Sequence, residues 1–125
     1  MTIDPSRTEN GLHVGTAHSR QAVLLTLHGD LDHDSGEHLL AVADRALSER
    51  EGTATVLRLD CRELGAVDSM GLSALLHVHR RAAQDGLFLQ LEGIPERLER
   101  LLRLTGTYEH FTGYATLGEE IAPEQ

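Results

Sequence analysis

The stretch Thr55-Val-Leu-Arg-Leu-Asp60 decides the fold class of this 125-residue chain. It is short, apolar and β-branched, which is typical of a central β-strand. Residues 22–28 form a similar apolar run that stops at Gly29. Between the two runs, apolar residues recur at helical spacing. A strand, a helix and a second strand in this order predict a β–α–β crossover with parallel strands.

The helix between these strands is predicted to be amphipathic. Its apolar face carries Leu39, Leu40, Ala43 and Leu47. Ser35 is a suitable N-cap, and Gly52 is a suitable stop. Residues 12–17 form a weaker strand candidate ahead of residues 22–28, so we expect the chain to open with a β-hairpin.

The same alternation continues after the central strand. The predicted elements are a helix whose apolar stripe runs from Leu72 to Ala83 before Gly86 closes it, a strand over 87–92, a helix that starts at Pro95 and stops at Gly106, a short edge strand around Phe111 and Tyr114, and a last helical turn over 117–121. We therefore expect one α/β domain, a mixed sheet of about four to five strands packed against about four helices. Its boundaries are placed at residues 11–122, with a flexible leader over 1–10 and a tail over 123–125.

Charge and composition exclude several classes of partner. The chain has 11 Lys and Arg against 20 Asp and Glu, a net charge of −9, so it should repel nucleic acid and anionic lipid. Only 3% of the residues are aromatic, which argues against base-stacking modules. The apolar runs are too short to span a membrane, and we expect a cytoplasmic protein.

Histidine and cysteine content does not predict a metal or redox site. Cys61 is the single cysteine, and we expect it to be a small buried hydrophobic residue. His77 and His79 are two residues apart on a predicted helix, so they point in different directions. A further polar group spans a loop and a helix start: Asp32, His33, Asp34, Glu37 and His38. Metal binding needs three or four ligands that converge at about 2.0–2.2 Å, so we interpret these side chains as solvated surface or pocket residues. His79 lies on the apolar stripe, and we expect it to be a hydrogen-bonded residue at the edge of the core.

The stretch Val67-Asp-Ser-Met-Gly-Leu72 contains the main candidate for function. A strand ends before it, and a helix begins at or next to Ser69. A serine at this place caps the helix by accepting a backbone N–H. The same place suits an attached phosphate, because unpaired N–H groups and the helix dipole stabilise an anion there. Spacing alone favours the cap and leaves the phosphorylation site as the alternative.

The longer run Asp60-Cys-Arg-Glu-Leu-Gly-Ala-Val-Asp-Ser-Met-Gly-Leu72 resembles the signature of STAS domains, specifically of bacterial anti-sigma factor antagonists. Three more stretches are similar to the family in the same order: Gly29-Asp-Leu-Asp32, the third predicted helix over residues 98–106, and the closing segment over 108–121. The resemblance covers residues 12–121. The resemblance depends on all four stretches occurring in the same order as in the family, because no single motif is specific.

The resemblance implies a protein-binding switch. In the family, the serine of this motif is phosphorylated by a partner that is both serine kinase and anti-sigma factor, and the corresponding residue here is Ser69. The unmodified antagonist occupies the kinase and releases the sigma factor, and a PP2C-type phosphatase resets the switch. ATP and magnesium belong to the kinase, so we expect this chain to be no enzyme and to need no cofactor.

The partner-binding surface implied by the resemblance surrounds the serine. Its expected residues are Asp32, Asp68, Ser69, Met70 and Gly71. The two carboxylates either shape the loop and meet the partner or are ordinary loop residues. Gly71 either admits a partner's backbone or relieves packing against the sheet. Met70 departs from the family pattern, since many relatives carry Ser or Thr there, and Ser73 is a competing hydroxyl one turn further on.

Two other function classes stay open. A non-catalytic STAS scaffold or small-ligand-binding module, of the stressosome, transporter or lipid-transport type, fits the same resemblance. A hydrolase would pair Ser69 with a His and an Asp, but the glycine two residues before the serine of a nucleophile elbow is missing. A single domain favours the free-standing antagonist, as a monomer or weak dimer.

Overall fold

The centre of the structure is a four-stranded sheet in the order β1-β2-β3-β4. The computed structural model describes residues 11–109 and 111. The strands are β1 (His13–His18), β2 (Ala22–Leu31), β3 (Val56–Val67) and β4 (Phe88–Glu92). β1 and β2 pair antiparallel, whereas β2 with β3 and β3 with β4 pair parallel. The predicted hairpin and crossover are confirmed.

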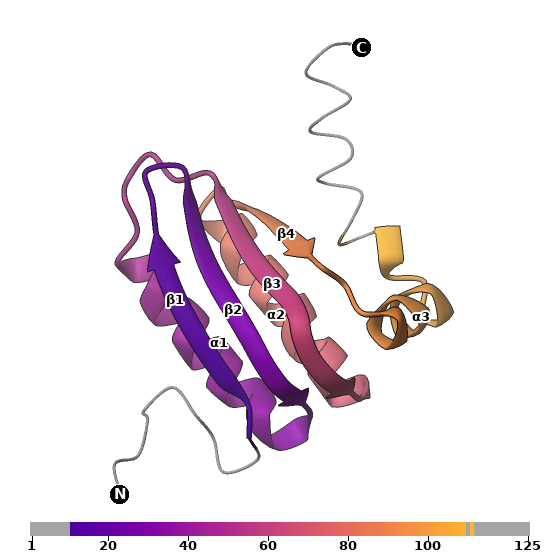
Figure 1. Cartoon of the computed structure of the whole chain (residues 1–125). Coiled ribbons are helices and arrows are strands. Elements are labelled where there is room, and N and C mark those ends of the chain that lie inside the picture. Colours follow the sequence, from indigo (N-terminus) through magenta and orange to yellow (C-terminus); the bar gives the residue numbers. More distant parts are fainter. Residues whose placement is uncertain (1–10, 110, 112–125) are drawn as a thin grey trace, which may run out of the picture.

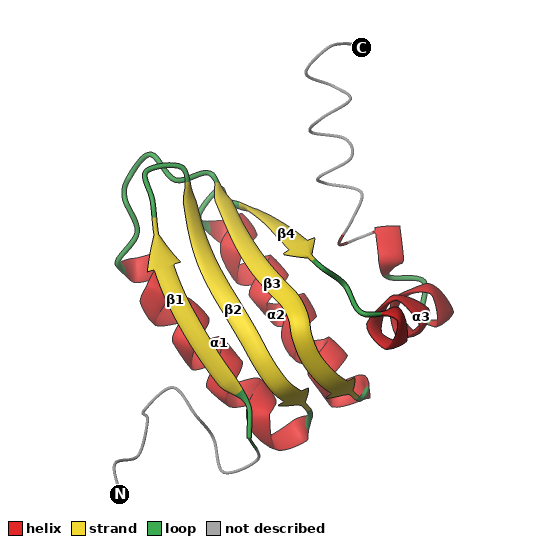
Figure 2. Ribbon diagram, viewed as in Figure 1, coloured by secondary structure: helices red, strands yellow, loops and turns green. Residues whose placement is uncertain are grey.

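Helices α1 (His33–Ser48) and α2 (Ser69–Gln84) lie side by side on one face of the sheet (Figure 1). The shorter α3 (Glu96–Leu104) lies beyond the β4 side (Figure 2). This arrangement confirms the predicted α/β class with a mixed sheet. The closing strand predicted around Phe111 is wrong at that residue, because Tyr108, Glu109 and Phe111 are helical. The rest of that segment with Tyr114, the helical turn over 117–121, the leader and the tail lie outside the described residues.

The core lies between the sheet and the two long helices. Alternate residues of β2 and β3 point toward the helices and are fully buried, as expected for a sheet that is covered on one face. The largest of them are Leu25, Leu27, Leu57 and Leu59. Cys61 is also fully buried, which confirms the prediction, and burial raises the pKa of its thiol to about 12.

Strand β3 is longer than the sequence predicts. The register shifts between Thr26 and His28 of β2, where three residues of β3 advance against two of β2. This bulge leaves Arg62 and Glu63 both exposed and returns Leu64 to the core. The predicted strand end at Asp60 is wrong because the bulge interrupts the alternation of buried and exposed residues.

Candidate functional site

Ser69 is the first residue of α2 and follows the N-cap Asp68. Asp68 has an extended backbone, and its Oδ1 accepts the Gly71 N–H at 2.8 Å. The prediction that Ser69 caps the helix is therefore wrong. Ser69 is exposed, and its hydroxyl forms no hydrogen bond within residues 11–109 and 111. The hydroxyl is accordingly available to a second protein.

Asp32 caps α1 in the corresponding place. Its Oδ1 accepts the N–H groups of Asp34 and Ser35, each at 3.1 Å, and Ser35 Oγ accepts the Asp32 N–H at 2.9 Å. This is a capping box, and its hydrogen bonds to Ser35 and Asp34 lower the pKa of the Asp32 carboxyl. Ser35, predicted as the N-cap, is instead the buried third residue of the helix.

The ends of β2 and β3 are joined by contacts that position the start of α2. Asp30 Oδ1 accepts the Ala66 N–H at 2.9 Å, and the Leu31 carbonyl accepts the Asp68 N–H at 3.3 Å. A Cβ on Gly71 would lie 2.2 Å from the Leu31 carbonyl oxygen. Of the two roles considered for Gly71, the structure supports close packing against the sheet. Asp30 was not among the predicted site residues, although it lies inside the quoted motif at 29–32.

A shallow groove runs between α1 and α2 beside this helix start. Its volume is about 210 Å³, and its apolar lining comes from Leu40, Met70 and Ala74. Met70 is 49% exposed, so the first turn of α2 presents an apolar side chain next to Ser69. Ser73 also lines the groove. It is half-buried whereas Ser69 is exposed, so the Ser73 hydroxyl is the less accessible of the two.

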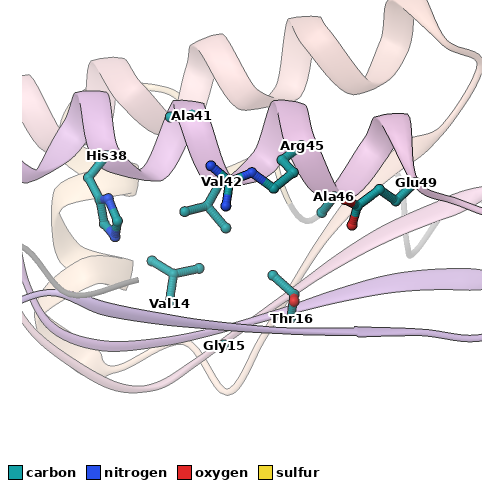
Figure 3. Close-up of a pocket in the computed structure, with 9 residues that line it drawn as sticks. All are labelled: Val14, Gly15, Thr16, His38, Ala41, Val42, Arg45, Ala46 and Glu49. Atoms are coloured by element: carbon teal, nitrogen blue, oxygen red, sulfur yellow. The ribbon is translucent and has the colours of Figure 1, made fainter. Parts of the chain in front are cut away.

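A second hollow, of about 250 Å³, lies away from Ser69 between β1 and α1 (Figure 3). Val14 and Thr16 line it from the strand, and Val42, Arg45 and Glu49 line it from the helix. The sequence carried no signal for this hollow, because it forms only where the edge strand meets the covering helix.

The histidines are dispersed. His77 is exposed, whereas His79 is buried and packs edge-on against Phe111, with ring centroids 6.1 Å apart. Within the described part of the chain, no three His, Cys, Asp or Glu side chains are arranged to hold a metal ion. No helix in that same part is both long and apolar enough to cross a membrane.

Comparison with known proteins assigns the family. A family model described as Mlab, STAS domain, matches residues 14–111. This chain belongs to the STAS domain family. The anti-sigma F factor antagonist of Paenibacillus polymyxa is 26% identical to this STAS domain over 98 residues, which are 78% of this chain and 82% of that protein.

Two solved structures share the STAS fold at low identity. The Bacillus cell fate determinant SpoIIAA in its phosphorylated form superposes with a TM-score of 0.60 at 19% identity, covering 87% of this chain and 98% of that one. A sulfate transporter family protein from Wolinella succinogenes superposes with a TM-score of 0.64 at 22% identity, covering 89% and 84%. Both likenesses concern the fold alone.

Proposed function

We propose that this STAS domain is an anti-sigma factor antagonist that acts in the cytoplasm. Its unphosphorylated form binds a serine-kinase anti-sigma factor and releases the sigma factor, and phosphorylation of Ser69 ends that binding. The observation that carries the proposal is the exposed Ser69 hydroxyl at the first position of α2, where Asp68 is the N-cap. The relationship to an anti-sigma F factor antagonist supports the class of partner.

The helix start can carry a phosphate without refolding. The N–H of Gly71 is bonded to the Asp68 side chain and that of Leu72 to the Asp68 carbonyl, so the earlier amides of α2 remain for an anion. A phosphate adds about −1.5 to −2 charges at neutral pH. A partner surface fitted to a neutral serine and to the apolar Met70 then faces a desolvation penalty and like-charge repulsion, and the complex dissociates.

The other proposed contact residues contribute in different ways. Asp68 and Met70 are exposed and meet the partner directly. Asp32 is half-buried and Gly71 is buried, so these two act mainly by holding the two helix starts in place. ATP and magnesium are supplied by the kinase, a PP2C-type phosphatase resets the switch, and the STAS domain itself performs no catalysis.

Phosphate transfer tests the assignment of the site. The full chain is incubated with the purified serine-kinase anti-sigma factors of the same organism and with ATP and magnesium, and the modified residue is located by mass spectrometry. We expect modification at Ser69, none in Ser69→Ala, and wild-type modification in the matched control Ser73→Ala. If Ser69→Ala is phosphorylated to the same extent as the wild type, the assignment is wrong.

Binding tests the release mechanism. Ser69→Ala should stay folded with a change in stability within about 0.5 kcal/mol, because the cap belongs to Asp68 and alanine is a good helix former. It should bind the kinase as the wild type does, whereas Ser69→Asp should bind more weakly. Equal affinity of Ser69→Asp and the wild type would contradict release by charge.

The likeness to a sulfate transporter family protein keeps one other function under consideration, a STAS module that binds a small ligand or a scaffold without turnover at Ser69. Native mass spectrometry of the purified chain distinguishes the two. A co-purified small molecule or a large assembly, together with no kinase binding, would favour the module.

A further inference from the structure

The groove between α1 and α2 opens on the same face of α2 as Ser69. Ser69 and Ser73 are four residues apart, so their side chains lie on one face of the helix, and Ser73 lines the groove. Met70, which is 49% exposed, lines it next to Ser69. The groove therefore begins beside the proposed phosphorylation site and continues along both helices.

Small residues and an ion pair hold the two helices at a fixed spacing here. Gly36 and Ala74 are buried at the floor of the groove, where a Cβ on Gly36 would lie 3.1 Å from the Ala74 Cβ. One helical turn beyond the groove, Arg81 Nε binds Asp44 Oδ1 at 2.8 Å and links the same two helices. The groove is therefore preformed and needs no rearrangement to receive a partner.

The size of the groove selects a side chain rather than a small molecule. Its volume is about 210 Å³, whereas sites for drug-sized ligands measure about 300–1,000 Å³. An apolar cavity of about 150 Å³ holds a benzene-sized group, so one aromatic or branched aliphatic side chain fits the groove.

The distribution of polar residues around the groove is that of a protein interface. Leu40 is half-buried and Ala74 is buried, so they provide an apolar floor. His33, Glu37 and His77 line the groove and are exposed, so they form a polar rim. An apolar pocket inside a polar rim is the usual seat of an anchoring side chain from a second protein.

The area that a stable complex covers identifies this second protein. A specific interface buries about 800 Å² on each partner, which corresponds to a patch that reaches about 16 Å from its centre. The groove extends from Met70 to His77, which are about 10 Å apart along α2. A kinase that receives the Ser69 hydroxyl in its active site therefore covers the groove as well.

We propose that the groove is the docking subsite for one apolar side chain of the serine-kinase anti-sigma factor. The inference rests on the function proposed above and adds Leu40, Glu37 and His77 to its contact surface. Burial of the kinase side chain stabilises the complex before and during phosphate transfer alike, because the groove does not touch the reacting hydroxyl. The groove therefore lowers the KM for phosphorylation of Ser69 and leaves kcat unchanged.

Filling the groove tests the proposal. Ser73→Phe and Glu37→Phe each place a phenyl ring there, from opposite helices. Both should weaken binding of the purified kinase about tenfold or more in titration calorimetry, and raise the KM for phosphorylation by a similar factor at unchanged kcat. Ala83→Phe is the matched control and should behave as the wild type, because Ala83 is exposed on α2 about 21 Å from Ser69 along the helix. Urea unfolding compares the stability of the three variants with that of the wild type.

Methyl NMR locates the contact independently of these variants. Addition of the kinase should shift the methyl signals of Leu40, because that side chain lines the groove. The methyl signals of Leu104, which is 79% exposed on α3, should stay in place. Leu40 signals that do not move in the complex would overturn the proposal.

Failure of this proposal and failure of the proposed function give different results. If the kinase phosphorylates Ser69 but binds the two groove variants as tightly as Ala83→Phe, the docking subsite is wrong and the proposed function stands. The same holds if the groove variants lower kcat and leave KM unchanged. If no kinase binds the wild type or phosphorylates Ser69, the proposed function fails, and the docking subsite fails with it.

Discussion

Replacing Gly71 by alanine is expected to destabilise this STAS domain, although alanine is the better helix former. Gly71 is buried in the first turn of α2, against the end of β2. The new Cβ would lie 2.2 Å from the Leu31 carbonyl oxygen and 2.8 Å from its carbon. Both atoms belong to the backbone of the sheet, so no side-chain rotation relieves the contact.

The size of the effect follows from that distance. Restoring an ordinary contact of 3.4 Å moves the start of α2 away from β2 by about 1.2 Å, the difference between 3.4 and 2.2. Overpacking of this kind costs about 1–3 kcal/mol, and distortion of the hydrogen bond between Asp68 and Gly71 costs about 1 kcal/mol more. The helix propensity of alanine offsets about 1 kcal/mol. We therefore expect a net loss of about 1–3 kcal/mol.

Urea unfolding measures this loss as a lower midpoint with an unchanged slope. Gly52→Ala is the matched control, because its Cβ would meet no atom within 4 Å. That substitution should be neutral or stabilise by about 0.4–1 kcal/mol, through the reduced entropy of the unfolded chain. A Gly71→Ala variant as stable as the wild type, or shifted like Gly52→Ala, would refute the argument that close packing excludes a side chain.

Three further outcomes are expected. Asp68→Ala should lose about 1 kcal/mol in the same urea assay through the lost cap, whereas Asp68→Asn should retain most of it; equal losses would show that the cap does not stabilise α2. Hydrogen bonding to Arg81 lowers the pKa of Asp85 from its ordinary 3.8, so this group stabilises the fold above that pH and the contribution is lost as pH falls through the lower folded value. Asp85→Asn should flatten the acid side of the stability profile, and an unchanged profile would contradict the linkage. The buried Cys61 thiol, with its pKa raised to about 12, should react with a thiol reagent near neutral pH only as fast as the chain opens, and rapid labelling of the folded protein would contradict its burial.

The sequence located the start of α2 correctly and assigned its cap to the wrong residue. Asp68 and Ser69 are adjacent and both are good capping residues, so composition alone does not distinguish them. The extended backbone at Asp68 identifies this residue as the N-cap. The same applies to Ser35, which was predicted as the N-cap of α1: Asp32 is the cap, and Ser35 is its partner in the capping box.

What the sequence determined by itself is local. The alternation of apolar residues in β2, the helical spacing before residue 48 and the glycine stops define the order of strands and helices, because each depends on residues close together in the chain. The ordered motifs also led to the family.

The tertiary structure alone decided how distant segments meet. The hydrogen bond from the Ala66 N–H to the Asp30 carboxylate joins residues 36 positions apart. A glycine is required at position 71 because the Leu31 carbonyl packs against it and leaves no room for a Cβ. The hollow between β1 and α1 likewise exists only after the sheet is assembled. These features depend on distances between elements, which no local pattern of residues encodes.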